Sequence, residues 1–594
     1  MTGLVAIVSA DRETSVDDED VQGLVGCYES IRGAGERDEA TGGPLARVVW
    51  FGRERDDGGV ERRGSSWVAA SGRPHASKDS LIGLPLHELD GQFALVSYDA
   101  DREEVCVASD PFGMHALYVG ARANATYVST SALALAKHLR ARPSRLGISI
   151  FLRAGAHFGT MTNWEGIERV DPGTRIRFTR HGVERDAYWR PRPDPRVSDM
   201  SFDRTVDHCL DVAIQALKAT FGDGGPLWTD LTGGFDTRLM NSLLESAGIQ
   251  FSTNTRDEEA ADARLSREVA GAAGWESIHL RLPADWADAL GSMVRTALAW
   301  GDANLEVLEL SWVLWAHREL GRSLPALLSG GGGEHFQYHA WKSEFLHAGR
   351  SNRVNFDNWV AMRMLRPVNT GLFARDPTLE VRADLARRMA RWVEPYSSEL
   401  NTTQLDLLYA YKMTGHCGAY LSADHAYLSA QLPYYLKDVF TAAVSTNYRF
   451  RNGHRLMRSM QERLNPRVAA ITTTSGGTAQ PFRPSNIHRS APYYGTLLRK
   501  AANKVSQKLG APVLPTVAHF DPAPMPTRRS LLVSLGDGAP LSSSRMRSAP
   551  LYRRGALDDF LAAACDGGAV DTALLGRILT IELALRAVDA GIED

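Results

Sequence analysis

The sequence has few cysteines, almost no net charge and no long apolar run. Its five cysteines are spread over 594 residues, with no CxxC pair and no Cys/His cluster at zinc-ligand spacing, which fits a reducing compartment. Lysine and arginine number 67 against 70 aspartates and glutamates, so a net charge of −3 gives no general attraction to nucleic acid or to an anionic membrane. No run approaches the roughly 18 apolar residues of a membrane span, and no basic region precedes an apolar one at the N-terminus. We therefore expect a cytoplasmic protein with no nucleic-acid or membrane partner.

The pattern of short elements divides the chain into two parts. Up to about residue 190 the sequence is rich in strand candidates, and residues 92–98 and 105–109 flank a charged turn as a hairpin does. Three prolines within residues 191–199 indicate a stiff boundary. We therefore predict domains at 1–195 and 200–594, the first made of packed sheets.

Beyond the boundary, apolar strands alternate with amphipathic helices. This alternation predicts a parallel sheet covered by helices, followed from about residue 357 by a mostly helical region. The predicted strands lie at residues 226–231, 250–255, 277–282 and 324–328, and the clearest helices at 236–247 and 260–273.

The segment TGGFDT joins the first of these strands to a helix. Gly233 and Gly234 allow a tight turn and a close approach of a ligand, and the helix N-terminus offers free N–H groups. Thr232 and Thr237 add hydroxyl donors, so the segment could hold a pyrophosphate. Asp236 would contact phosphate only through a cation, for which Mg²⁺ is the natural choice. The alternative is an ordinary glycine turn in which Asp236 or Thr237 caps the helix.

TGGFDT resembles the SGGxDS pyrophosphate loop of ATP-pyrophosphatases, with threonine in place of both serines. Other segments resemble the asparagine synthetase family in the same order along the chain. DGQFA at 90–94 and SDPFG at 109–113 are similar to the DGxFA and RDxFG segments of its amidotransferase domain, and QLPY at 431–434 is similar to the RVPF segment of its synthetase domain. The resemblance implies an N-terminal Ntn-type, glutaminase-like αββα domain and a C-terminal parallel-sheet ATP-pyrophosphatase domain (adenine nucleotide α-hydrolase-like) with a helical extension.

The segment GGGGEHF at residues 330–336 follows the fourth predicted strand. In the resembling family this strand ends in GEGxDE, whose aspartate binds a second magnesium ion, and Glu334 falls at that position. The resemblance therefore implies ATP and Mg²⁺ as cofactors, with Asp236 and Glu334 as metal ligands and with Leu231 and Gly332 beside the nucleotide. The alternative is a flexible glycine loop with a surface glutamate.

The N-terminal part departs from the family pattern. Family members that hydrolyse glutamine have cysteine at position 2, where this sequence has Thr2, and the glutamine-binding NGEIYN segment is replaced by VAASGR at 68–73. An N-terminal threonine is a nucleophile in other hydrolases. Because both the cysteine and the glutamine-binding segment are lost, we nevertheless expect no glutaminase activity, and an amine that arrives with the substrate.

Within the superfamily, β-lactam synthetases, carbapenam synthetases and the macrolactam synthetases of lasso peptides use such an amine. The first two deprotonate it with a Tyr–Glu dyad, whose positions fall here at Gly331 and at about Ser429. The chain therefore resembles most the macrolactam synthetases, which join the N-terminus of a precursor peptide to an Asp or Glu side chain. This implies a precursor peptide substrate, with a leader peptidase or a leader-binding protein as a further partner. A small-molecule amide or β-lactam-type synthetase, an asparagine synthetase using free ammonia, and a non-enzymatic relic stay as alternatives.

The family's late catalytic lysine is also absent, since residues 471–489 contain no lysine. Arg483 is the nearest fixed cation and could stabilise transition-state charge, although arginine and lysine are not interchangeable. His335 and His416 are candidate bases because imidazole titrates near neutral pH. A surface or structural role is the alternative for each of these residues.

Overall fold

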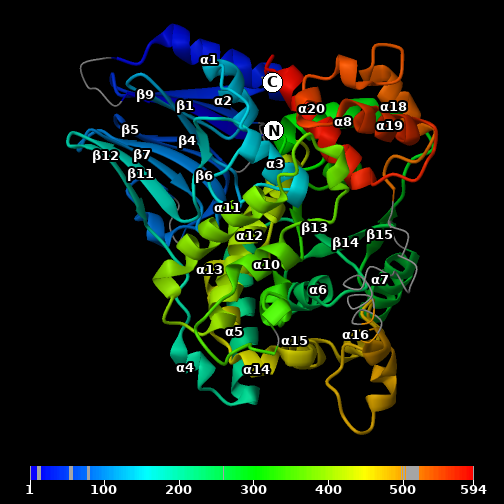
Figure 1. The fold of residues 1–594 in the computed structure, drawn as a ribbon. Helices are drawn as coiled ribbons and strands as arrows, with labels where there is room; N and C mark the ends of the chain where they lie inside the picture. Colours follow the sequence, from blue (N-terminus) through cyan, green and yellow to red (C-terminus); the bar gives the residue numbers. More distant parts are fainter. Residues whose placement is uncertain are drawn as a thin grey trace.

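Figure 1 shows a computed structural model of the chain. The N-terminal strands lie on one side of the molecule and most of the later helices on the other. The structure describes residues 2–9, 15–52, 58–76, 80–257, 260–344, 346–496, 498, 502 and 521–592. Within these residues no helix is both long enough and apolar enough to cross a membrane.

Two six-stranded antiparallel sheets form the N-terminal part. The first has the strand order β10-β8-β9-β1-β3-β2, with bounds Ile167–Arg169, Tyr118–Arg122, Ala125–Ser129, Gly3–Ser9, Ala46–Gly52 and Glu36–Gly42. The second has the order β12-β11-β7-β6-β5-β4, with bounds Gly182–Ala187, Thr174–Thr179, Glu104–Ser109, Asp90–Asp99, Ser66–His75 and Gly59–Arg63. The predicted hairpin is confirmed, because β6 and β7 pair up to Asp99 and Glu104.

The two sheets stack on an apolar core that both supply, with Ala6 and Val48 from one and Ala94 and Val107 from the other. Helices α1 (Asp18–Arg32) and α2 (Ala132–Leu139) pack on the outer face of the first sheet. The outer face of the second sheet is instead covered by the apolar side chains of residues 81–89. The αββα prediction is therefore right about the sheets and the first helical layer. In the described part of the chain, residues 81–89, with a short 3₁₀ helix at Leu86–Glu88, take the place of the second layer.

The C-terminal part contains a five-stranded parallel sheet. Its order is β15-β14-β13-β16-β17, with bounds Ser277–Leu280, Phe251–Arg256, Leu227–Asp230, Ala326–Leu328 and Ser429–Gln431. The sequence predicted the first four strands, and the three-residue β17 was missed. The chain moves outward from β13 to β15 and then from β16 to β17 in the opposite direction. The carboxyl ends of β13 and β16 therefore form a topological switch point, the usual ligand site of such sheets.

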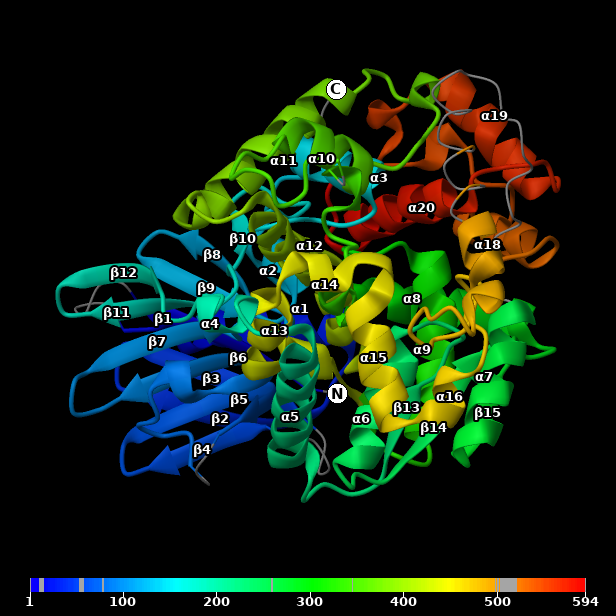
Figure 2. The same ribbon diagram turned by 90° about the horizontal axis from the view of Figure 1, so that it is seen from below.

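Helices cover both faces of this sheet, and successive strand residues point to opposite faces. Leu227 and Leu328 pack against α5, α6, α13 and α15, whereas Trp228 and Leu327 share a core with α12. Figure 2 shows α5, α6 and α15 close together. The helices that follow α2 are α3 (Arg145–Ala154), α4 (Pro195–Ser198), α5 (Phe202–Phe221), α6 (Asp236–Ser246), α7 (Ala260–Ala273), α8 (Trp286–Gly301), α9 (Val307–Gly321), α10 (Phe356–Arg363), α11 (Thr378–Val393), α12 (Asn401–Asp424), α13 (Lys437–Ser445), α14 (Tyr448–Arg451), α15 (Arg455–Leu464), α16 (Pro466–Ala469), α18 (Thr527–Leu535), α19 (Arg554–Cys565) and α20 (Thr572–Ala587).

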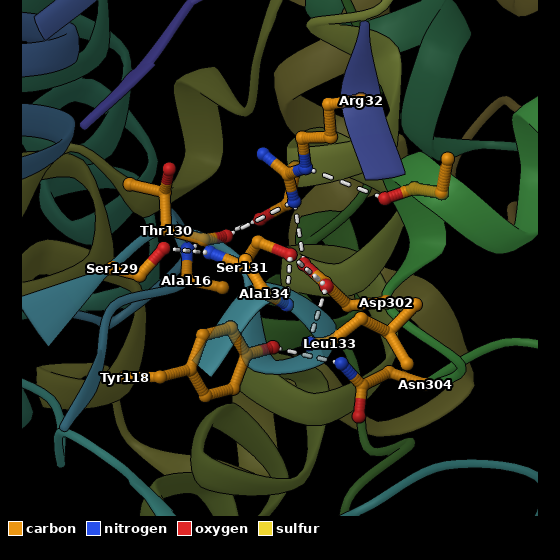
Figure 3. Close-up of polar contacts among 12 residues, drawn as sticks. Arg32, Ala116, Tyr118, Ser129, Thr130, Ser131, Leu133, Ala134, Asp302 and Asn304 are labelled. Atoms are coloured by element: carbon orange, nitrogen blue, oxygen red, sulfur yellow. Dashed lines mark hydrogen bonds and ion pairs between the residues drawn. The ribbon is translucent and has the colours of Figure 1, made fainter. Parts of the chain in front are cut away.

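A buried ion pair joins the two parts. Arg32 of α1 lies 2.5 Å from a carboxylate oxygen of Asp302, just after α8, and both side chains are almost fully buried. Figure 3 shows that Asp302 also accepts hydrogen bonds from the hydroxyl of Ser131 and the amide of Leu133, and that Asn304 donates to Tyr118. Separating the two parts or removing one partner would leave a buried charge unpaired, which is costly. These contacts therefore stabilise the packing of α8 against the N-terminal part.

Candidate functional site

The loop after β13 is held in shape by its own hydroxyl groups. The amide of Thr232 donates to the hydroxyl of Thr237 at 3.0 Å, and the two threonine hydroxyls lie 3.1 Å apart. The amide of Gly234 donates to the Thr232 hydroxyl at 3.2 Å, and that of Gly233 to Asp262 at 3.0 Å. A Cβ on Gly233 would lie 2.8 Å from the Thr474 side chain, so glycine is needed for close packing. The loop is therefore a preformed turn that leads directly into α6.

Asp236 is the first residue of α6 and is a partly accessible residue. Its Oδ1 accepts a hydrogen bond of 2.6 Å from the side-chain amide of Gln337, which is buried. The hydroxyl of Tyr434 donates to its backbone carbonyl at 2.8 Å. These contacts fix the carboxylate at the carboxyl end of β13.

Glu334 lies beyond β16, in a short 3₁₀ turn (Gly333–Phe336), and is also partly accessible. Its Oε2 accepts from the amide of Gly332 at 3.0 Å. Gly332 has φ = 99°, a conformation that suits glycine, and a Cβ on Gly333 would lie 2.5 Å from Asp236 Oδ1. The glycines thus allow the loop after β16 to pass directly against the aspartate.

The ionisation of Asp236 is made less favourable by its surroundings. Burial first, and the charge of Glu334 second, raise the pKa of Asp236 well above its ordinary range. A divalent ion held by the two carboxylates would relieve the effect of the Glu334 charge on Asp236. No group of three or more His, Cys, Asp or Glu side chains with metal-binding geometry occurs among the described residues, so a bound ion would take further oxygens from water or from a phosphate.

Leu231, predicted beside the nucleotide, and His335, predicted as a base, are both buried. Leu231 is fully buried, and its amide and carbonyl bond to the neighbouring strand β14. His335 is buried behind the loop, with Nε2 3.0 Å from the hydroxyl of Tyr435. Burial, with Arg451 nearby, lowers the pKa of His335 to about 3, so the ring is neutral near pH 7 and faces the core. Its surroundings therefore give no support to a role as a general base.

The structure does not bring the predicted cation to the two carboxylates. Arg483 makes a two-point ion pair with Glu462 at 2.8 and 2.5 Å, and about half of its side chain is exposed (53%). His416 is in the middle of α12, and burial together with Lys412 and Arg366 lowers its pKa to about 4. Neither residue contacts Asp236 or Glu334 through a hydrogen bond or ion pair.

The two positions that correspond to the Tyr–Glu dyad, Gly331 and Ser429, lie at opposite ends of the strands. A Cβ on Gly331 would lie 3.0 Å from the end of the Leu432 side chain, which is a tight contact. Ser429 opens β17 and pairs with Ala326 at the amino end of β16, on the edge of the sheet away from the site. A different tyrosine, Tyr409 of α12, points its hydroxyl at Glu334 Oε1 at 3.5 Å.

The sequence analysis missed Tyr409 and Gln337, because neither lies in a motif. Burial and the charge of Glu334 raise the pKa of Tyr409 well above its ordinary value, so the hydroxyl stays protonated and cannot act as a base near neutral pH. The position of Gln337, three residues after Glu334, is the signal that could have identified it as a neighbour of the same loop.

At the N-terminus, Thr2 is almost fully buried under the C-terminal part. Its hydroxyl lies 3.0 Å from Nδ1 of His425, the residue that follows and caps α12. His115 packs edge-on against His425 and contacts the hydroxyl of Ser71 at 3.0 Å. Burial lowers the pKa of both histidines far below neutrality. The side chain of Thr2, at the position of the glutaminase nucleophile, is thus buried against His425.

Comparison with known proteins bears mainly on the N-terminal part. Residues 84–189 match the family model of a glutamine amidotransferase domain. With its two antiparallel sheets, this part of the chain is a glutamine amidotransferase-type domain. No curated protein matches the chain.

Two solved structures show only distant similarity. One is a glutamine phosphoribosylpyrophosphate amidotransferase from B. subtilis complexed with ADP and GMP, at 11% identity and a TM-score of 0.22 over 47% of this chain and 65% of that one. The other is an allosteric regulatory enzyme of purine biosynthesis, at 12% and 0.22 over 42% and 64%. The chain therefore spans less than two thirds of either protein, and at these values neither informs its activity.

Proposed function

We propose that the chain is an ATP-dependent carbon–nitrogen ligase that adenylates a carboxylate and joins it to an amine. The observation that carries this proposal is the pair Asp236 and Glu334, placed on either side of the topological switch point beside a glycine loop. A substrate carboxylate attacks the α-phosphorus of ATP and pyrophosphate leaves. The amine then attacks the acyl carbon, AMP leaves with the bonding electrons, and the amine gives up a proton to solvent.

The loop residues have clear roles in this scheme. The hydroxyl groups of Thr232 and Thr237 and the first amides of α6 would bind pyrophosphate oxygens. Asp236 and Glu334 would hold Mg²⁺, which would supply positive charge to the phosphate oxygens. Gln337 keeps the Asp236 carboxylate oriented through its 2.6 Å hydrogen bond.

For the substrate, we propose a precursor peptide whose N-terminal amine closes a macrolactam on an Asp or Glu side chain. The burial of Thr2 favours an amine that arrives with the substrate, and Gly331 stands where the small-lactam synthetases have the tyrosine of their dyad. A peptide α-amine has a pKa of about 8 and is partly neutral without a dedicated base, whereas an alkyl amine with a pKa of about 10 is almost wholly protonated. Holding both ends of one peptide also makes the second step intramolecular.

The test is to incubate the protein with ATP, Mg²⁺ and candidate peptides, and to follow AMP and a mass loss of one water. We expect ring closure with a free N-terminus, and adenylation without ring closure after N-acetylation. Turnover only with a free amino acid or a β-amino acid would replace the peptide by a small-molecule substrate. Turnover with aspartate and ammonia would indicate an asparagine synthetase using free ammonia.

A further inference from the structure

A small cavity adjoins Asp236 through Gln337. The cavity has a volume of about 190 Å³, and Gln337, one of the residues that line it, donates the 2.6 Å hydrogen bond to Asp236 Oδ1. His454 also lines the cavity and stacks on Phe235, with ring centroids 4.6 Å apart and the ring planes within 10° of each other. Two residues of the cavity wall therefore contact the glycine loop and the first residue of α6.

The loop that follows α16 supplies another part of the wall. Its Ser475 lines the cavity, and the preceding Thr474 donates from its amide to the carbonyl of Gly233 at 3.0 Å. The buried guanidinium of Arg238 donates to the carbonyls of Gly233 and Thr472 at 3.2 and 3.0 Å, so it ties the two loops together. Ser475 is partly accessible, and its hydroxyl forms no hydrogen bond with any residue that the structure describes. This hydroxyl is therefore open to a ligand.

The cavity is lined by hydrogen-bond donors. Each of the eight side chains that line it in the described part of the chain carries an N–H or O–H group, and none is acidic. The hydroxyl of Thr496 already donates to a backbone carbonyl. Lys342 brings a positive charge, with its ammonium 5.9 Å from the centre of the Tyr338 ring. His339 has a pKa lowered to about 3, by burial first and then by Arg363 and Lys342. Such a lining favours an anion, whose oxygens accept from the donors.

The size of the cavity narrows the kind of anion. Pockets for whole small molecules usually measure about 300–1,000 Å³, so this cavity is too small for a complete nucleotide or a peptide segment. It has the volume of roughly six water molecules in the liquid, which is enough for one or two phosphate groups. An apolar ring would also fit, but it would leave the donors of the wall without acceptors. A phosphate-type anion therefore suits both the size and the lining.

We propose that this cavity receives the terminal phosphates of ATP and holds them as the leaving pyrophosphate, with Lys342 as the cation and Ser475 and His339 as further donors. This inference rests on the proposed function, and it extends the phosphate site beyond the loop of Thr232 and Thr237. When an oxygen of the substrate carboxylate bonds to the α-phosphorus, the bond from that phosphorus to the bridging oxygen breaks, and its electron pair stays with pyrophosphate. The Lys342 ammonium stabilises this negative charge, and no proton moves in the step.

The test measures the binding of pyrophosphate with Mg²⁺ by isothermal titration calorimetry, without ATP or substrate. We expect Lys342→Met to weaken binding about tenfold or more, because a charge-assisted contact is lost, and Ser475→Ala to weaken it about fivefold. Lys218→Met, at an exposed lysine of α5, is the matched control and should bind as the wild type does. Equal affinity in all of these proteins, no binding by the wild type, or sulfate bound as tightly as pyrophosphate would overturn the proposal.

AMP separates the terminal phosphates from the rest of the nucleotide. Lys342→Met should bind AMP as the wild type does, because AMP has no terminal phosphates. The same variant should bind the non-hydrolysable analogue α,β-methylene-ATP about tenfold less tightly than the wild type. An equal loss of affinity for both nucleotides would assign Lys342 to the nucleoside end of the site and overturn the proposal.

Thermal melting without ligand separates a binding role from a structural one. Because Lys342 is partly accessible, Lys342→Met should melt within about 2 °C of the wild type. If Lys342→Met fails to fold, Ser475→Ala decides, and an unchanged affinity for pyrophosphate in that variant would overturn the proposal. The expected binding losses, in a protein whose wild type turns over no ATP with any peptide, would reject the proposed function and leave the pyrophosphate site standing. Turnover by the wild type with unchanged pyrophosphate affinity in Lys342→Met would reject this site alone.

Discussion

The hydroxyl of Thr2 lies 3.0 Å from Nδ1 of His425, although the two residues belong to opposite parts of the chain. The contact is buried, and His115 packs against the same histidine. A nucleophile needs space for its substrate, and here the space around the hydroxyl is taken by the end of α12. The hydroxyl of Thr2 therefore lies in the contact between the two parts of the chain.

We predict that the wild type releases no glutamate from glutamine and that Thr2→Ala retains amide-forming activity. Loss of one buried hydrogen bond should lower the free energy of unfolding by about 1 kcal/mol. Glutamate release is measured with a coupled dehydrogenase assay and stability by chemical denaturation. Glutamate release by the wild type that disappears in Thr2→Ala would show that the domain is an active glutaminase.

Replacing Gly333 with alanine should disrupt the carboxylate pair. The new Cβ would lie 2.5 Å from Asp236 Oδ1, so the aspartate or the loop must move. We expect pyrophosphate release to fall on the order of a hundredfold.

The matched control is Gly271→Ala in the last turn of α7, where a Cβ meets nothing within 4 Å. That change should leave activity intact and stabilise the fold by about 0.5–1 kcal/mol. Equal activity of the two variants would contradict the close approach of the loop.

The stability of the protein should depend on Glu306, which caps α9 by accepting from the amides of Leu308 and Glu309 at 2.9 and 2.8 Å. Burial, with Glu309 nearby, raises its pKa from 4.5 to about 8. A raised pKa means that the folded state binds the proton more tightly, so the free energy of unfolding falls as pH rises from 4.5 through 8. Glu306→Gln should remove this fall and be more stable than the wild type at pH 9. Glu380→Gln, an exposed residue of α11, serves as the control, and parallel pH profiles for all three proteins would count against the burial of this charge.

The rate of ring closure should rise with pH through the pKa of the peptide amine, about 8. Burial keeps His335 and His416 neutral, with pKa values of about 3 and 4, so neither can impose a transition near pH 6.5. The measurement is the initial rate of product formation between pH 5.5 and 9. A lower limb near pH 6.5 that disappears in His416→Gln would identify this histidine as the base and reject the expectation.

The sequence predicted most of the elements that form the site. The strand before TGGFDT, the helix that begins at Asp236 and the strand before GGGGE all occur where the pattern placed them, because local periodicity and glycine turns determine such elements. The packed sheets and the hairpin at 92–109 were equally clear. The three-residue β17 was missed because so short an element has no periodic pattern.

The sequence alone did not predict which residues tertiary packing brings near the site. Tyr409 and Lys412 lie on an unremarkable helix, and only the packing of α12 against the loop after β16 places them near Glu334. For the same reason Arg483, selected by its position in a motif region, pairs with Glu462 instead. The burial of His335 likewise depends on Tyr435 and Phe440, which are about a hundred residues away.

Pyrophosphate release from ATP by Asp236→Asn and Glu334→Gln, with a cyclisable peptide and Mg²⁺, tests the central claim most directly. Both changes keep the shape of the side chain and remove a charge. Because burial, and second the charge of Glu334, raise the pKa of Asp236, Asp236→Asn should also melt at a higher temperature than the wild type without ligand. The account predicts folded variants whose pyrophosphate release falls on the order of a hundredfold or more, beside an unchanged Glu380→Gln control. Pyrophosphate release close to that of the wild type in both variants would contradict it.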